Sequence, residues 1–84
     1  MKVYVCCDNR KNAFGDTAYD NCYNVQKIYD KKEKAEQWLY EIACKENWYS
    51  WHDDYSPEEI DELRRNTARD NQDEDVYFVE VEVE

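Results

Sequence analysis

Glycine and proline are scarce in this 84-residue chain, which has one of each. Flexible linkers are rich in these residues, and no segment of the chain repeats another, so we expect one folded domain over residues 1–84. One glycine also cannot build the glycine-rich loop that cradles a phosphate group. This scarcity excludes nucleotide enzymes of that type.

Long apolar runs are absent too. The first run, residues 3–7, has only five residues before Asp8, too few for a signal-peptide core or a membrane span. We therefore expect the protein to be cytoplasmic, in the cytoplasm of the host cell, and to have no membrane partner. In that reducing compartment, free structural thiols are expected rather than disulfides. The four cysteines are Cys6, Cys7, Cys22 and Cys44.

Basic side chains are scarce in the C-terminal part of the chain. Residues 1–52 hold eight acidic and eight basic side chains, whereas residues 53–84 hold thirteen acidic and three basic ones. The entire net charge of -10 therefore lies in the C-terminal part. Such a one-signed field repels nucleic acids and membranes and favours a basic partner.

Three segments have the patterns of β-strands. The first covers residues 2–7, and the second covers residues 22–29, with Tyr23, Val25, Lys27 and Tyr29 on one side. Residues 76–84 (VYFVEVEVE) alternate regularly. We expect the glutamates of this last strand to face solvent and four residues to face the core: Tyr77, Val79, Val81 and Val83.

Two helices are expected between the second and third strands. Asp30 and Glu33 have the spacing of an N-cap and its capping-box partner, and an apolar stripe follows at Ala35, Trp38, Leu39, Ile42 and Ala43. A second start is marked by Ser56, Pro57 and Glu59. Beyond it the apolar stripe is thin, which indicates a short surface helix.

These elements predict an α+β fold of the order β-β-α-α-β. A three-stranded antiparallel sheet would carry the main helix on one face, with the first strand in the centre because the last one has edge-protecting charges. A monomer is expected, because Glu80, Glu82 and Glu84 would oppose stacking of the final strand on another sheet.

The KVYV opening, the strand with Val25 and Ile28, the DKKEKAEQWL helix start and the YFVEVEVE ending cover about half of the chain. In these segments it resembles small accessory proteins of phages and mobile elements of Gram-positive bacteria, anti-CRISPR-like inhibitors among them. The resemblance implies a compact sheet-plus-helix scaffold and an accessory role. It carries over no catalytic residues, and both the aromatic segment at residues 47–55 and the acidic second helix depart from it.

Side chains for catalysis or metal binding are few. His52 could act as a base with Asp53 or Asp54, but it lies in an aromatic segment where a structural role is the better interpretation. The cysteines lack the spacing of zinc ligands, and residues 70–75 lack the ligand pattern and central glycine of a calcium loop. We predict that the protein is not an enzyme and has neither metal nor cofactor.

The acidic part and the aromatic segment supply the candidate partner-binding residues. Glutamates on alternate positions of a strand, together with acids on a helix face and in a loop, could form an array that mimics a nucleic-acid backbone. Trp51 and Tyr55 are of the type that anchors interfaces. The acidic set is Glu58, Asp61, Glu62, Asp70, Asp73, Glu74, Asp75, Glu80, Glu82 and Glu84.

The leading functional hypothesis is an inhibitor that occludes the basic nucleic-acid-binding surface of a host defence nuclease, such as a CRISPR effector. Two alternatives remain open. One is a protein-interaction module that uses the aromatic residues as its hot spot while the acids only solubilise. The other is a protein that sequesters a small ligand between aromatic walls and His52.

Overall fold

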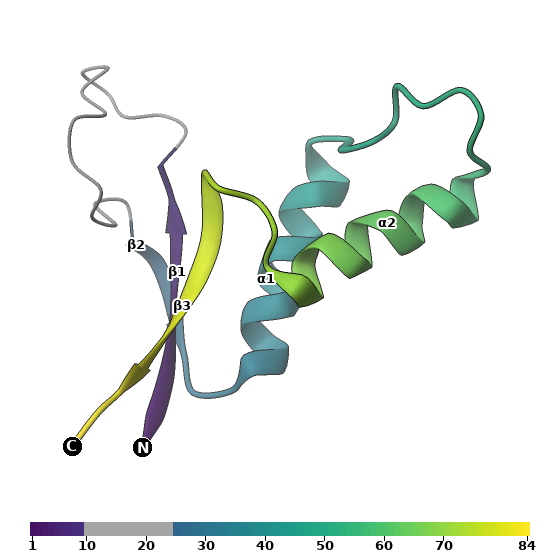
Figure 1. Cartoon of the computed structure of the whole chain (residues 1–84). Helices are drawn as coiled ribbons and strands as arrows, with labels where there is room; N and C mark the ends of the chain where they lie inside the picture. The colour runs from purple at the N-terminus through teal and green to yellow at the C-terminus, as the bar shows by residue number, and fades with distance from the viewer. Residues whose placement is uncertain (10–24) are drawn as a thin grey trace.

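The computed structural model describes residues 1–9 and 25–84. The elements follow the predicted order: β1 (Lys2–Asp8), β2 (Val25–Tyr29), α1 (Lys32–Lys45), α2 (Pro57–Asp70) and β3 (Val76–Glu82). The strands form one antiparallel sheet with β1 between β2 and β3, as predicted (Figure 1). Residues 22–24, where the second strand was expected to begin, lie outside the described residues.

Helix α1 packs on one face of the sheet through the predicted stripe. Ala35, Leu39 and Ala43 are buried, and Trp38 and Ile42 pack partly buried beside them. From the sheet, the side chains of Cys6, Val76 and Phe78 complete this core, and Ala68 of α2 joins it. Both helices lie on the same side of the sheet (Figure 1).

The predicted start of α1 is wrong by one residue. Lys31, not Asp30, is the N-cap, and no side chain caps the helix. The Asp30 carboxylate instead accepts a hydrogen bond from the Lys34 ammonium at 3.3 Å. An N-cap carboxylate must reach the backbone N–H groups of the first turn, and Asp30 lies one position too early for that.

Helix α2 begins as the sequence predicts. The Ser56 hydroxyl accepts from the Glu59 N–H, the Glu59 carboxylate accepts from the Ser56 N–H, and Pro57 occupies the first turn. The helix has 14 residues, as many as α1, and packs on α1 rather than on the sheet. Its thin stripe buries only Thr67 and Ala68.

Asn71 ends α2 and ties it to β3. Its backbone is left-handed, with φ of 54°, and its N–H bonds the Thr67 carbonyl. Its side-chain amide then donates to the Phe78 carbonyl at 2.7 Å and accepts from the Phe78 N–H at 3.2 Å. Asn71 thus continues the ladder at the outer edge of β3.

The predicted orientation of β3 is wrong. Val76 and Phe78 are the buried residues, whereas Val79, Val81 and Val83 are about 40% exposed. Alternation places Glu80 and Glu82 on the same, helix-covered side of the sheet as Val76 and Phe78. These two glutamates are nevertheless exposed, because this side of the strand continues beyond the helix. The sequence pattern separates the two faces of the strand correctly, but it does not say which face the helix covers.

The pairing of β1 with β2 contains an irregularity that moves Val25 to the other face. Val5 lies opposite Ile28 and Cys7 opposite Val25, with the register shift between Cys6 and Cys7. An extra residue in a strand changes the side on which later side chains point. The prediction that Val25 shares a face with Tyr29 is therefore wrong.

The prediction of free thiols holds for Cys6 and Cys44 but is wrong for Cys7, which is disulfide-bonded. Cys22 lies outside the described residues. The prediction was based on the redox state of the cell compartment. The redox state does not determine which sulfur atoms the fold brings together.

Candidate functional site

The aromatic segment between α1 and α2 has an unusual backbone. Asn47 and Tyr49 are left-handed, with φ of 58° and 66°. This conformation is uncommon for a bulky residue such as tyrosine, and it persists only where the surroundings hold it. Three hydrogen bonds hold the segment. The Trp48 N–H donates to the Ala43 carbonyl of α1 at 2.9 Å, Arg64 Nε of α2 donates to the Trp48 carbonyl at 2.8 Å, and the Tyr49 hydroxyl bonds the Thr67 hydroxyl of α2 at 2.7 Å. The segment is therefore fixed to both helices.

Four rings cluster in this segment. The rings of Trp51 and His52 stack with centroids 3.7 Å apart, and Tyr55 and Tyr49 lie 5.0 and 6.2 Å from His52. Trp51 is 73% exposed. A tryptophan this exposed on a braced backbone is available as an interface anchor. His52 itself has aromatic neighbours, in accordance with its structural interpretation.

An open pocket of about 240 Å³ joins this segment to the turn between α2 and β3. Trp48, Tyr49 and Trp51 line it together with Asp73. One Asp73 oxygen accepts from the N–H groups of Asp75 and Val76, at 2.9 and 2.8 Å, and so shapes the turn. Rings from one segment and an acidic turn from another therefore share one pocket.

In the sequence, four exposed carboxylates follow the residues that line this pocket: Asp53 and Asp54 on one segment, and Glu74 and Asp75 on the other. None of them has an ion-pair or hydrogen-bond partner for its side chain among the described residues. We call the pocket and these flanking residues the aromatic–acidic surface. Its members are Trp48, Tyr49, Trp51, Tyr55, Asp53, Asp54, Asp73, Glu74 and Asp75.

The predicted acids of α2 differ among themselves. Asp61 accepts hydrogen bonds from the Tyr40 hydroxyl and from Arg65 Nε, the latter at 2.8 Å. The Tyr40 hydrogen bond, followed by Arg65, lowers the pKa of Asp61, and the bond to Asp61 is the main reason why the pKa of Tyr40 rises to about 12. Glu58 and Glu62 are exposed and have no ion-pair partner in the described part of the chain. Asp61 therefore holds the helices together, and Glu58 and Glu62 remain free to meet a partner.

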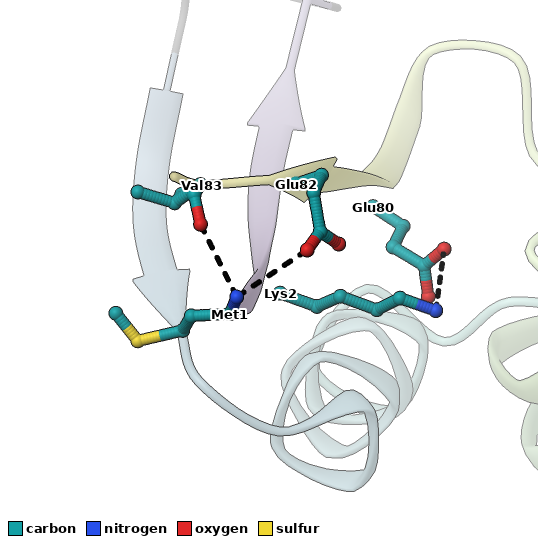
Figure 2. A network of polar contacts seen from close by, with 5 residues as sticks. All are labelled: Met1, Lys2, Glu80, Glu82 and Val83. Carbon is teal, nitrogen blue, oxygen red and sulfur yellow. Dashed lines mark hydrogen bonds and ion pairs between the residues drawn. The ribbon is translucent and has the colours of Figure 1, made fainter.

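The acids of β3 are largely compensated within the sheet (Figure 2). Glu80 accepts a hydrogen bond from the Tyr4 hydroxyl at 3.0 Å and pairs with the Lys2 ammonium at 3.8 Å. Glu82 pairs with the Met1 ammonium at 3.3 Å. The sequence argument missed these pairs because they depend on the register of β1 against β3. On α2, Asp70 is paired as well, with its neighbour Arg69 at 3.6 Å.

The predicted acids thus form three groups and not one array. Asp73 lines the pocket and Glu74 and Asp75 follow it in the same turn. Four of the predicted acids lie on α2, namely Glu58, Asp61, Glu62 and Asp70, while Glu80 and Glu82 lie on β3 and Glu84 lies just beyond that strand. Glu84 is nine residues beyond Asp75 along an extended chain, which corresponds to about 30 Å. Trp51 and Tyr55 belong with the first group.

The described residues also limit what chemistry can be assigned. Among them, no group of three or more His, Cys, Asp or Glu side chains is placed to hold a metal ion. Burial raises the pKa of the Cys6 thiol to about 11, so this thiol stays protonated and unreactive near neutral pH. Within residues 1–9 and 25–84, neither helix has the length and apolar character needed to cross a bilayer.

Comparisons of the chain with protein-family models, with curated proteins and with solved structures find no match. The function must therefore be argued from the residues of this chain.

Proposed function

We propose that this protein binds a cationic, nucleic-acid-binding surface of another protein and blocks it by occlusion, without catalysis. The aromatic–acidic surface is the contact region. A defence nuclease that grips nucleic acid through arginine and lysine, such as a CRISPR effector, is the class of partner that the proposal has in view.

The observation that carries the proposal is the pocket shared by three aromatic rings and Asp73, next to the unpaired carboxylates of Glu74 and Asp75. An arginine side chain stacks on aromatic faces and pairs with carboxylates through its guanidinium group. The same group binds phosphate in a nucleic-acid complex. A surface that both stacks on a guanidinium group and pairs with it through carboxylates would compete with nucleic acid for the same arginine side chain.

Charge favours the same partner. With a net charge of -10, the chain is attracted to a positive surface over a range set by the Debye length, about 8 Å at physiological salt.

A second candidate is an interaction module that depends on the rings alone. It is favoured by the local compensation of Asp61, Asp70, Glu80 and Glu82, which leaves fewer carboxylates to mimic a phosphate backbone. In that case Trp51 would anchor a partner of any charge.

Affinity capture tests the proposal and separates the candidates. The tagged protein is incubated with a bacterial lysate, and bound proteins are identified by mass spectrometry before and after addition of duplex DNA or RNA. We expect nucleic-acid-binding proteins that the added duplex releases. A chain of this charge does not itself bind the duplex, so release reports competition on the partner.

Three variants locate the contact. E74Q/D75N removes two charges at the pocket, E84K changes the charge by the same amount at the far end of β3, and W51A removes the exposed ring. We expect at least tenfold less capture with E74Q/D75N and W51A, and unchanged capture with E84K. Loss with W51A alone would favour the ring-only module. Bound proteins that resist the duplex would overturn the occlusion mechanism.

A further inference from the structure

No helix or strand among the described residues covers the face of the sheet opposite α1, and the side chains on this face are apolar in every described strand. The register places them in cross-strand rows: Val3 opposite Val81, then Val5 between Ile28 and Val79, then Cys7 between Val25 and Tyr77. Both helices lie on the other side (Figure 1). Cys7 is the exception to the exposure of this face, because this residue is fully buried and disulfide-bonded. We call the residues of these rows other than Cys7, with Val83, the open face.

Exposure and charge distinguish this face from the rest of the molecule. Ile28 is 62% exposed and Val25 47%, and the three valines of β3 are each about 40% exposed. No described residue of the open face is charged. The charged side chains of the strands all alternate to the helix side, and they are Lys2, Asp8, Lys27, Glu80 and Glu82.

We propose that two copies of this chain dimerise by packing their open faces together as a two-sheet sandwich. The exposed side chains amount to on the order of 400 Å² of apolar surface per copy, at the upper end of what monomeric proteins expose in one patch. Two copies would bury about 800 Å² in total, which is less than the roughly 1,000 Å² of a stable interface and corresponds to a weak dimer.

A second copy fits this face better than a charged or polar partner does. The face offers neither a charge to select a partner nor a polar group in the middle rows, whereas pleated apolar faces stack on each other at about 10 Å. A two-fold axis brings each row against its equivalent in the other copy. Face-to-face packing also leaves the carboxylates of both chains on the outer, helix-covered sides, so the two negative charges approach with the sheets between them.

The helices, and with them the aromatic–acidic surface, point outward in such a dimer. Each dimer would present two copies of that surface in opposite directions. This arrangement does not depend on the proposed function, because the open face and the aromatic–acidic surface share no residue.

Sedimentation equilibrium tests the dimer over concentrations from about 1 μM to about 1 mM, a range suited to a weak dimer with a small interface. Lysine at position 28 or 81 would bury a charge in the interface, so I28K and V81K are each expected to weaken dimerisation at least tenfold. Both positions are exposed in the single chain, so the monomer should keep its far-ultraviolet circular dichroism spectrum.

E84Q is the matched control. It changes the net charge by +1, as I28K and V81K do, but it lies off the open face, so dimerisation should not weaken. A wild-type chain that stays monomeric throughout the range would overturn the proposal. A dimer that survives both lysine variants would also overturn it, because it would be formed by strand edges, and equal weakening in E84Q would reveal a general charge effect.

Discussion

The hydroxyl of Tyr40 on α1 donates a hydrogen bond to the carboxylate of Asp61 on α2, and Arg65 contacts both. The guanidinium carbon of Arg65 also lies 4.2 Å from the centre of the Tyr40 ring. Since α2 packs on α1 and not on the sheet, this trio is a principal polar link that sets the position of α2.

The link predicts a late titration of Tyr40. Hydrogen bonding to Asp61 raises the pKa of Tyr40 to about 12, so its phenolate should form well after that of an ordinary tyrosine, near 10. The change D61N removes the carboxylate and should return the pKa of Tyr40 toward 10. Ultraviolet absorbance of the tyrosinate, with Y40F to assign the transition, measures this. The pKa of Tyr4 is raised as well, by its hydrogen bond to Glu80, so Y40F should reduce the late transition without removing it. A late transition of unchanged amplitude in Y40F would contradict the assignment.

The same link predicts a pH dependence of stability at the acid end. The pKa of Asp61 is lower in the folded chain than in the unfolded one, because Tyr40 and Arg65 favour its charged form. Its stabilisation is therefore present above the unfolded pKa, near 3.9, and is lost as the pH falls toward the folded pKa. Urea unfolding at a series of pH values should show a smaller acid-side loss for D61N than for wild type. Identical pH profiles would show that Asp61 contributes nothing.

Asn71 provides a test of how α2 is joined to β3. N71G keeps the left-handed backbone accessible but loses the two amide bonds to Phe78, which should cost about 2 kcal/mol of unfolding free energy. N71A loses the bonds and also places a Cβ in a left-handed conformation, which should cost about 1 kcal/mol more. Denaturant unfolding measures both. N71A as stable as wild type would contradict this role.

Cysteine labelling tests the burial of the core. With its pKa raised to about 11 by burial, Cys6 should resist iodoacetamide in the folded protein at neutral pH, and Cys44, which is only partly buried, should react first. Peptide mapping by mass spectrometry reads the two sites separately. Unfolding in denaturant should make Cys6 reactive, and equally fast labelling of both thiols in the folded protein would show that the core around Cys6 is open.

The fold was predictable from the sequence because its signals are local. The order of elements, the stripe of α1, the Ser56 capping box and the central place of β1 all follow from short-range patterns. The facing of β3 did not, because VYFVEVEVE fits either orientation until the helix is placed over Val76 and Phe78. Val25 changed face through an irregularity in β2 that no residue type marks.

The candidate site was predictable only as a set of residue types. Segregated charge and clustered rings were visible in the sequence, but the pairing of Glu80 and Glu82 with Lys2 and Met1 required the strand register. The pocket shared by Trp48, Tyr49, Trp51 and Asp73 required the path of two loops that are far apart in the chain. The positive φ of Tyr49 had no signal in the sequence, because tyrosine rarely adopts it, whereas Asn47 is of a residue type that tolerates it.

The salt dependence of binding to a purified captured partner tests the central claim most directly. Occlusion of a cationic surface predicts that the association constant falls as the salt concentration rises, and that E74Q/D75N makes the slope of this dependence shallower while E84K leaves it unchanged. Binding that does not respond to salt, or a slope that E74Q/D75N does not alter, would contradict the account.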